Sequence, residues 1–229
     1  MSKEFGWSYL YTKRNDVVLI QNIAINCFPN AKYIYKLDED IIICNNFFKN
    51  LFETYINTQE KGQYHVGVVA PLLPVNGFGY IHVLKRLNRF DDYEKKFGRA
   101  QFGSNKDDQI MVNPDCSKYM WNLTYNIDDL AKQFESSNEI YPCFCRFSIG
   151  AILFSRDLWE QMGMFKADFS NGLGNDEVQL CAYCMTSSKT FIVAGNTLAG
   201  HFSFGPQNKA MEEAYKKDQM FSRLCKSSN

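Results

Sequence analysis

Three acidic residues interrupt an apolar stretch near the beginning of the chain. Asp38, Glu39 and Asp40 follow the strand-like run Tyr33-Ile34-Tyr35 and precede Ile41-Ile42-Ile43. Charged groups are costly to bury without compensation, so carboxylates at the end of a buried strand indicate a bound cation. Residues two apart on an extended backbone point to the same side. We therefore expect Asp38 and Asp40 to share one divalent ion, Mn²⁺ or Mg²⁺, which also binds diphosphate oxygens.

Two acids and a histidine later in the chain are further candidates. Asp176 and Glu177 open a predicted helix, and one of them is a candidate general base. Acids in a first helical turn also interact favourably with the helix dipole, so a capping role stands beside the catalytic one. His201, in a Gly-His-Phe turn, is a candidate metal ligand or a structural histidine.

Gly150 lies in the middle of an apolar run that is predicted to be a strand. A glycine in a strand marks either close approach of a ligand to the backbone or a bulge. We expect the first, with Gly150 beside the bound substrate.

Strand-like and helix-like patterns alternate along the chain, which predicts an α/β sandwich in a single domain over residues 1–229. Helical spacing is found over 16–28, 45–55 or beyond, 83–97, 115–136, 157–162, 176–185 and 208–225. Strands are expected over 32–37, 65–73, 147–155 and 190–194, and a separate segment over 198–204 carries His201. Irregular segments are expected over 102–114, 137–141 and 172–175.

Composition excludes several classes of function. The 229 residues are 45% hydrophobic, which suffices for one domain with a full core. Lys+Arg and Asp+Glu both number 25, so we expect no nucleic-acid partner. No apolar run approaches the roughly 20 residues of a membrane span. The first fifteen residues lack a signal-peptide core, so we expect a cytoplasmic protein. The mixed charges over 85–96 indicate a solvated helix face, with peripheral membrane contact at most.

The eight cysteines are interpreted mainly as packed thiols. The pairs Cys143/Cys145 and Cys181/Cys184 allow a four-thiolate zinc site as an alternative. The first pair is spaced more tightly than usual zinc ligands, and no turn glycines surround either pair, which favours packed thiols.

The order of these motifs resembles that of the GT-A-fold glycosyltransferases, in particular the inverting family 2. Residues 33–40 are similar to its Tyr-Ile-x-x-Leu-Asp-x-Asp run, and residues 21–26 to the helix before that strand. Residues 148–156 and 163–165 resemble the glycine-containing strand, its arginine and the Gly-x-Phe end of the next helix. Residues 176–180 resemble Glu-Asp-x-x-Leu with the two acids in swapped order, and His201 takes the place of the family's later histidine.

The resemblance implies a GT-A-like mixed sheet flanked by helices and a metal-dependent transferase. Such an enzyme moves a sugar from a nucleotide-sugar donor to a hydroxyl of a glycan or lipid-linked glycan, with inversion, in polysaccharide biosynthesis. Asp40 would be the direct metal ligand, Asp38 would also touch the ribose side, and His201 would be the third ligand. Matching by position assigns the catalytic base to Glu177, with Asp176 as its neighbour.

One departure concerns the beginning of the chain. The family has a strand, a helix and a second strand for the nucleotide base before the Asp-x-Asp strand, and that part is not recognisable here. We therefore expect a fragment, or a reduced enzyme whose nucleotide site is completed elsewhere. A non-catalytic protein that binds a glycan or a partner chain is the first alternative. A metal-dependent nuclease or phosphatase is the second, disfavoured by the single Asp-x-Asp and the neutral charge.

Overall fold

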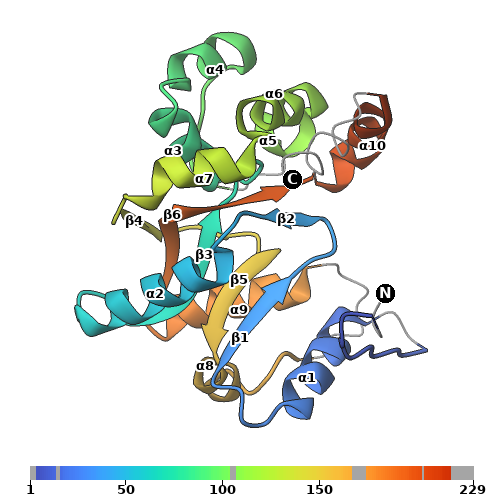
Figure 1. The fold of residues 1–229 in the computed structure, drawn as a ribbon, viewed down its shortest axis with the longest axis vertical. Coiled ribbons are helices and arrows are strands. Elements are labelled where there is room, and N and C mark those ends of the chain that lie inside the picture. Colours follow the sequence, from blue (N-terminus) through green and yellow to red (C-terminus); the bar gives the residue numbers. More distant parts are fainter. Residues whose placement is uncertain (1–3, 14–15, 104–106, 167–173, 203, 218–229) are drawn as a thin grey trace.

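The computed structural model describes residues 4–13, 16–103, 107–166, 174–202 and 204–217 (Figure 1). Their buried hydrophobic side chains form one continuous cluster. Among the helices within these ranges, none combines the length and the apolar character needed to cross a bilayer.

A six-stranded mixed sheet forms the centre of the molecule, which confirms the expected α/β class. The strand order is β1-β5-β3-β6-β2, and β4 also pairs with β6. β3 and β6 are parallel, and the other pairs are antiparallel. The strands are β1 (Tyr33–Leu37), β2 (Ile41–Ile43), β3 (Val66–Leu72), β4 (Ile140–Cys143), β5 (Ala151–Ser155) and β6 (Thr190–His201).

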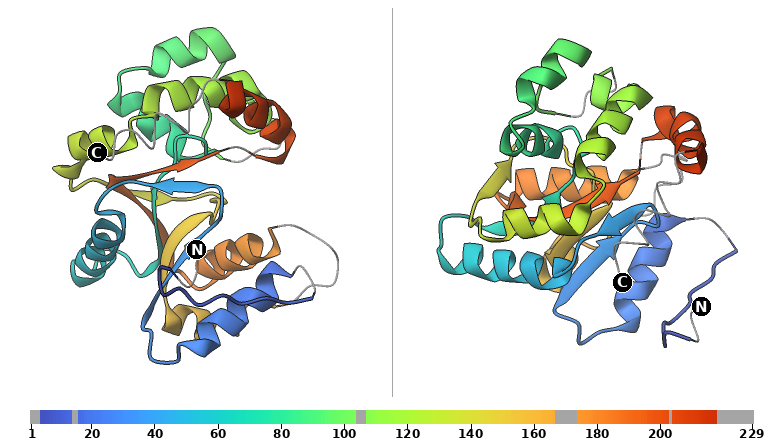
Figure 2. Two further views of the ribbon diagram at one scale, coloured as in Figure 1. Left: turned by 45° about the vertical axis from the view of Figure 1, so that its right-hand side comes forward. Right: turned by 45° about the horizontal axis from the view of Figure 1, so that its top comes forward.

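Helices cover both faces of this sheet. α2 packs against β3 and β6, and the left view of Figure 2 shows α9 on the opposite side of the strands. Figure 1 shows α3 to α7 and α10 gathered at one end, and α1 and α8 at the other. The helices are α1 (Val17–Cys27), α2 (Phe47–Glu60), α3 (Gly79–Arg86), α4 (Phe90–Phe97), α5 (Gln109–Val112), α6 (Pro114–Thr124), α7 (Ile127–Glu135), α8 (Arg156–Gln161), α9 (Asn175–Thr186) and α10 (Asn208–Lys217), with a short 3₁₀ turn at Gly205–Gln207.

The sheet curls because its two ends are joined by a very short connection. β1 and β2 lie at opposite ends of the strand order, yet only residues 38–40 separate them. Four Cα–Cα steps, from Leu37 to Ile41, span at most about 14 Å. The two ends of the sheet must therefore approach each other, as in a barrel, and the acidic residues lie at that closure.

β6 continues through a segment that the sequence had divided into two. Its partners in β3 shift between Ala194 and Leu198, so residues 195–197 form an irregularity in the ladder. Beyond it, the strand pairs with β2 up to His201. The prediction of separate segments over 190–194 and 198–204 was wrong, because the extra residues form a bulge inside one strand and not a turn between two.

Several other predicted boundaries were also wrong. The helix over 83–97 is α3 and α4, divided at Asn88, whose φ of 54° is left-handed and ends a helix. The helix over 115–136 is α6 and α7, and the strand over 147–155 begins only at Ala151. β4 forms in the expected break, and α5 in the expected loop over 102–114. Residues 104–106, 172, 173 and 218–225 lie outside the described residues.

Arg156, whose role the sequence left open, holds the end of α1. Its guanidinium donates to the carbonyl oxygens of Ile25 and Phe28 at 2.7 Å and of Ala31 at 2.9 Å. The last carbonyls of a helix have no partner within the helix, and a cation there also suits the helix dipole. Arg156 therefore connects the segment that enters β1 with the residue that follows β5.

A buried tryptophan holds the far end of β6. Trp121, which is 2% exposed, donates from Nε1 to the carbonyl oxygens of His201 at 3.0 Å and Phe202 at 3.3 Å. Its ring lies against Gly200, where an added Cβ would be 2.4 Å from Cη2. Only glycine allows this approach, so Gly200 and Trp121 together position His201.

We predict that Gly200→Ala lowers the free energy of unfolding by about 1–3 kcal/mol, because the new methyl group overpacks a filled core. Gly205→Ala is the matched control, since a Cβ there meets no atom within 4 Å. Urea denaturation of both variants measures the difference. Equal stabilities for the two variants would contradict the proposed packing.

Candidate active site

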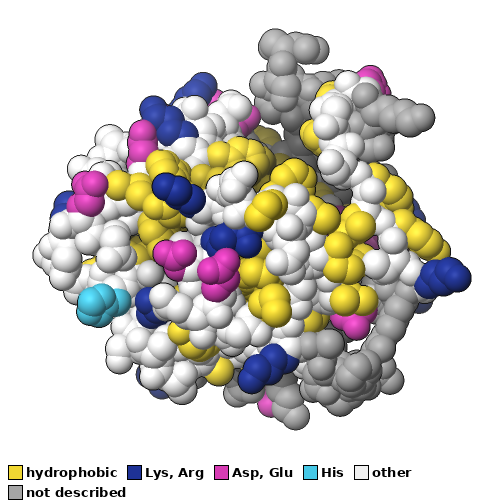
Figure 3. All heavy atoms as spheres, turned by 90° about the horizontal axis from the view of Figure 1, so that it is seen from below, with side chains coloured by type: hydrophobic (Ala, Val, Ile, Leu, Met, Phe, Trp, Pro, Cys, Tyr) yellow, Lys and Arg dark blue, Asp and Glu magenta, His cyan; other side chains and the backbone are white. Residues whose placement is uncertain are grey.

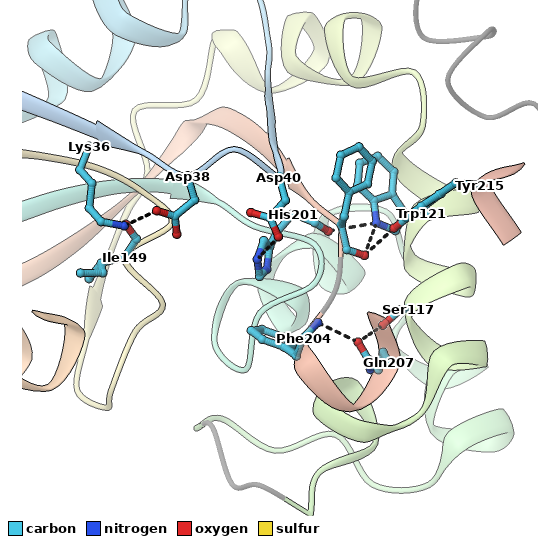
Figure 4. Close-up of polar contacts among 11 residues, drawn as sticks. Lys36, Asp38, Asp40, Ser117, Trp121, Ile149, His201, Phe204, Gln207 and Tyr215 are labelled. Carbon is cyan, nitrogen blue, oxygen red and sulfur yellow. Dashed lines mark hydrogen bonds and ion pairs between the residues drawn. The ribbon is translucent and has the colours of Figure 1, made fainter. Parts of the chain in front are cut away.

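The acidic triplet forms a turn and not the extended segment that the sequence predicted. β1 ends at Leu37, and the Ile41 amide donates to the Asp38 carbonyl oxygen at 3.3 Å. The expectation that both carboxylates point to one side of a strand was therefore wrong. Figure 4 shows Asp38 turned toward Lys36 and Asp40 turned toward His201.

The Asp38 carboxylate is paired with Lys36, a residue of the preceding strand β1. Lys36 Nζ donates to Asp38 Oδ1 at 2.5 Å and to the Ile149 carbonyl oxygen at 3.0 Å. Burial raises the pKa of Asp38, the Lys36 ammonium opposes that rise, and the charges of Asp40 and Asp176 add to it. Asp38 is thus influenced by the charges of two other acids, one of which comes from a distant segment.

Gly150 lies directly against this turn. Its carbonyl oxygen accepts a hydrogen bond from the Asp38 amide at 2.8 Å. A Cβ at Gly150 would lie 3.2 Å from both Asp38 Oδ2 and Ile41 Cδ1. The close approach that the sequence indicated is made by the acidic turn itself, and contact of Gly150 with a substrate stays a prediction.

Asp40 and His201 are brought together by strand pairing. Ile41 of β2 lies opposite His201 of β6, so the preceding residue, Asp40, is beside the imidazole. His201 Nε2 is 3.2 Å from Asp40 Oδ2. Burial raises the pKa of Asp40, but the hydrogen bond and charge of His201 outweigh it and hold that pKa below its ordinary value.

The Asp40–His201 pair suits two ligands of one octahedral cation. Ligand atoms about 2.1 Å from such an ion and at right angles to each other are about 3 Å apart. His201 is 7% exposed, and its Nδ1 has no partner in the part of the chain that the structure describes. Among those same residues, no group of three or more His, Cys, Asp or Glu is arranged to hold a metal ion. Within the described residues the pair could therefore supply two ligands of a cation.

Asp176 and Glu177 lie in the first turn of α9, after Gly174, whose φ is 86°. Asp176 is 6% exposed, and its Oδ2 accepts a hydrogen bond from Gln21 Nε2 at 2.8 Å. Asp176 Oδ1 accepts from the Glu177 amide at 3.0 Å. Asp176 thus gives the Glu177 amide, in the first turn of the helix, a hydrogen-bond acceptor, as the capping interpretation expects. The catalytic interpretation stays a prediction.

Glu177 faces Arg146. The guanidinium Nε donates to Glu177 Oε1, and the Glu177 side chain is only 18% exposed. Burial raises the pKa of Glu177, Arg146 opposes that rise, and the charge of Asp176 adds to it. A raised pKa brings a carboxylate closer to the range in which it accepts a proton efficiently.

Three partners of the predicted site residues were not assigned a role from the sequence. The contact of Lys36 could have been predicted, because side chains two residues apart at the end of a strand can point to the same side. The contacts of Gln21 with Asp176 and of Arg146 with Glu177 could not, since each joins distant parts of the chain. Of these three contacts, one is local and two are long-range.

The thiols do not form the zinc site considered above. Cys143 and Cys145 have their Sγ atoms 3.7 Å apart, whereas Cys184 is buried against Gly67. Within the described ranges no cysteine cluster of metal-binding geometry is present. The predicted packing of Cys184 is thus observed, and Cys143 and Cys145 are only partly buried.

Comparison with known proteins gave no match to a family model, to a curated protein or to a solved structure. The function is therefore inferred from the residues of the site. On the face seen from below, basic and acidic side chains are scattered among hydrophobic ones (Figure 3).

We predict opposite pH dependences of stability for Asp40→Asn and Glu177→Gln. The lowered pKa of Asp40 means that its carboxylate stabilises the fold above its unfolded pKa, an effect lost as pH falls through the folded value. The raised pKa of Glu177 means that its charge costs stability as pH rises through the folded value.

Urea denaturation between acidic and neutral pH tests this pair. As pH rises, the free energy of unfolding of Asp40→Asn should fall further below that of the parent protein. The free energy of unfolding of Glu177→Gln should rise relative to that of the parent protein. Curves that shift in the same direction would show that the two carboxylates do not occupy the contrasting environments described.

Proposed function

We propose that this chain is a metal-dependent glycosyltransferase with a GT-A-like fold, which uses a nucleotide-sugar donor and inverts the anomeric carbon. The observation that carries the proposal is the pairing of Asp40 with His201, 3.2 Å apart at the closure of a mixed sheet. The charge of Asp176 is among those that act on Asp38, which lies in the same turn as Asp40. The order of the motifs in the sequence supports the same function.

Asp40 and His201 would hold Mn²⁺ or Mg²⁺ together with the donor diphosphate. When bound, the ion supplies Lewis-acid stabilisation of the negative charge that develops on the leaving diphosphate. Asp38, which accepts from Lys36, would contact the ribose, and it could become a further metal ligand only by turning away from Lys36. The Lys36 ammonium keeps that carboxylate oriented until substrate arrives.

Glu177 is proposed as the base that takes the proton from the acceptor hydroxyl. Burial raises the pKa of Glu177, which suits that task, and the charge of Asp176 adds to the rise. Arg146 forms an ion pair with the Glu177 carboxylate. An acceptor hydroxyl would therefore have to displace Arg146 or bind to the other carboxylate oxygen. Asp176, the neighbouring acid in the same first turn of α9, is the alternative base.

The acceptor is proposed to be a hydroxyl of a glycan or lipid-linked glycan in polysaccharide biosynthesis. We also propose a cytoplasmic location, no nucleic-acid partner and at most peripheral membrane contact. A non-catalytic protein with the same site, which binds a glycan or a partner chain, is the rival that the following experiments separate.

Calorimetric titration with UDP and GDP, in Mn²⁺ or in EDTA, tests the metal site. We expect binding of one nucleotide only with Mn²⁺, and at least a tenfold weaker affinity for Asp40→Asn and His201→Ala. Glu39→Gln is the matched control, because Glu39 is exposed in the same turn. Absence of Mn²⁺-dependent binding, or equal loss in the control, would contradict the proposal.

Release of nucleoside diphosphate from a panel of sugar nucleotides tests catalysis. Glu177→Gln should lower turnover by about 10²–10⁴-fold with donor affinity retained, as expected for loss of a general base. The same loss in Asp176→Asn alone would assign the base to Asp176. Donor binding without turnover of any sugar nucleotide would favour the non-catalytic alternative.

A further inference from the structure

Two partly exposed thiols lie in contact at the end of β4, outside the roles assigned above. Cys143 is the last residue of the strand, and Cys145 follows in the segment that leads to β5. Their Sγ atoms are 3.7 Å apart, and the Cys143 thiol also donates to the Cys145 carbonyl oxygen at 3.3 Å. Both residues retain access to solvent.

The positions of these residues allow a covalent bond. Disulfides join residues whose Cα atoms are about 4.4–6.8 Å apart, a range open to residues two apart in a chain. The two sulfur atoms would have to approach from 3.7 Å to about 2.05 Å, within reach of a local adjustment.

The two thiols are chemically unequal. Hydrogen bonding from Cys143 lowers the pKa of the Cys145 thiol, although burial acts against it. The pKa of Cys143 is raised, first by this hydrogen bond and then by burial. Cys145 is thus the better thiolate, and Cys143 is the neighbour that can complete a reaction begun there.

We propose that Cys143 and Cys145 form a reversible dithiol–disulfide pair that reacts with small-molecule disulfides. The Cys145 thiolate attacks one sulfur of the small disulfide, forms a mixed disulfide and expels the first thiolate. Cys143 then loses its proton and attacks Sγ of Cys145, which expels the second thiol. The two protein thiols are oxidised, the small disulfide is reduced to two thiols, and a reductant reverses both steps.

The pair is connected to the candidate active site through the chain itself. Cys145 immediately precedes Arg146, whose guanidinium contacts Glu177. Closing the ring over residues 143–145 changes the backbone at Cys145, so oxidation should move Arg146 away from Glu177. The redox state of the thiols would then alter the surroundings of the proposed base.

Oxidised glutathione is the probe for the thiol chemistry, which is read out by peptide mass spectrometry and needs no enzymatic activity. We expect the peptide containing Cys143 and Cys145 to lose two hydrogen atoms and to regain them with dithiothreitol. Cys27 is the internal control, because it is more exposed but has no thiol beside it within the described residues. It should carry a glutathione adduct at most.

Two variants distinguish this pair from other reactions. Cys143→Ser should trap glutathione on Cys145, and Cys181→Ser should leave the disulfide unaffected. A bond from either residue to Cys181, or oxidation no faster than modification of Cys27, would overturn the proposal. Circular dichroism of each variant verifies folding, so that loss of reactivity through unfolding is recognised.

Phenylglyoxal labelling measures the coupling to the site. Oxidation should raise the labelling rate of Arg146, because its guanidinium is released from Glu177. In Cys143→Ser, oxidised glutathione should not raise the phenylglyoxal labelling rate of Arg146 to the same extent. An unchanged rate after complete disulfide formation would show that the thiol pair is not connected to the Arg146–Glu177 contact.

Discussion

The short acidic connection between β1 and β2 is the constraint on which the rest of the structure depends. It joins the two ends of the strand order, so the sheet has to curl until those ends approach. The turn faces the end of β6 on one side and Gly150 on the other. Charged residues therefore occupy the connection at which the ends of the sheet approach, and Asp40 is paired there with His201 from a distant segment.

The carboxylates around this closure are held in contrasting states. His201 keeps Asp40 in its charged form, whereas burial works against the charge of Asp38 and of Glu177. A fold optimised only for stability would not gather acids whose charges oppose one another, and perturbed carboxylates of this kind cluster at functional sites. If the proposed function holds, this contrast would suit Asp40 to binding a cation and Glu177 to accepting a proton.

Local patterns predicted much of this architecture. Apolar spacing predicted the helix over 16–28 and the strand over 32–37. The acidic residues at the end of that strand indicated the candidate site. The strand was predicted to end at Leu37, but the turn that follows was missed, because Asp38 and Asp40 were placed on one side of an extended backbone. The course of β6 was missed because residues 195–197 have turn-like composition, and only pairing with β2 and β3 determines that they form a bulge. Contacts such as Arg146 with Glu177 depend on the tertiary fold and leave no local pattern.

Arg156 has a consequence for the alignment of β1 with β5. Its guanidinium holds Ala31 just before β1 begins, and the Asp38–Gly150 hydrogen bond fastens the opposite end of the same ladder. A short strand at the end of a sheet is prone to slippage, and a slip by one residue would turn every side chain to the other face. With both ends fastened, such a slip would break both attachments at once. The register of this ladder, and with it the direction in which Lys36 points, is therefore fixed from outside the strand.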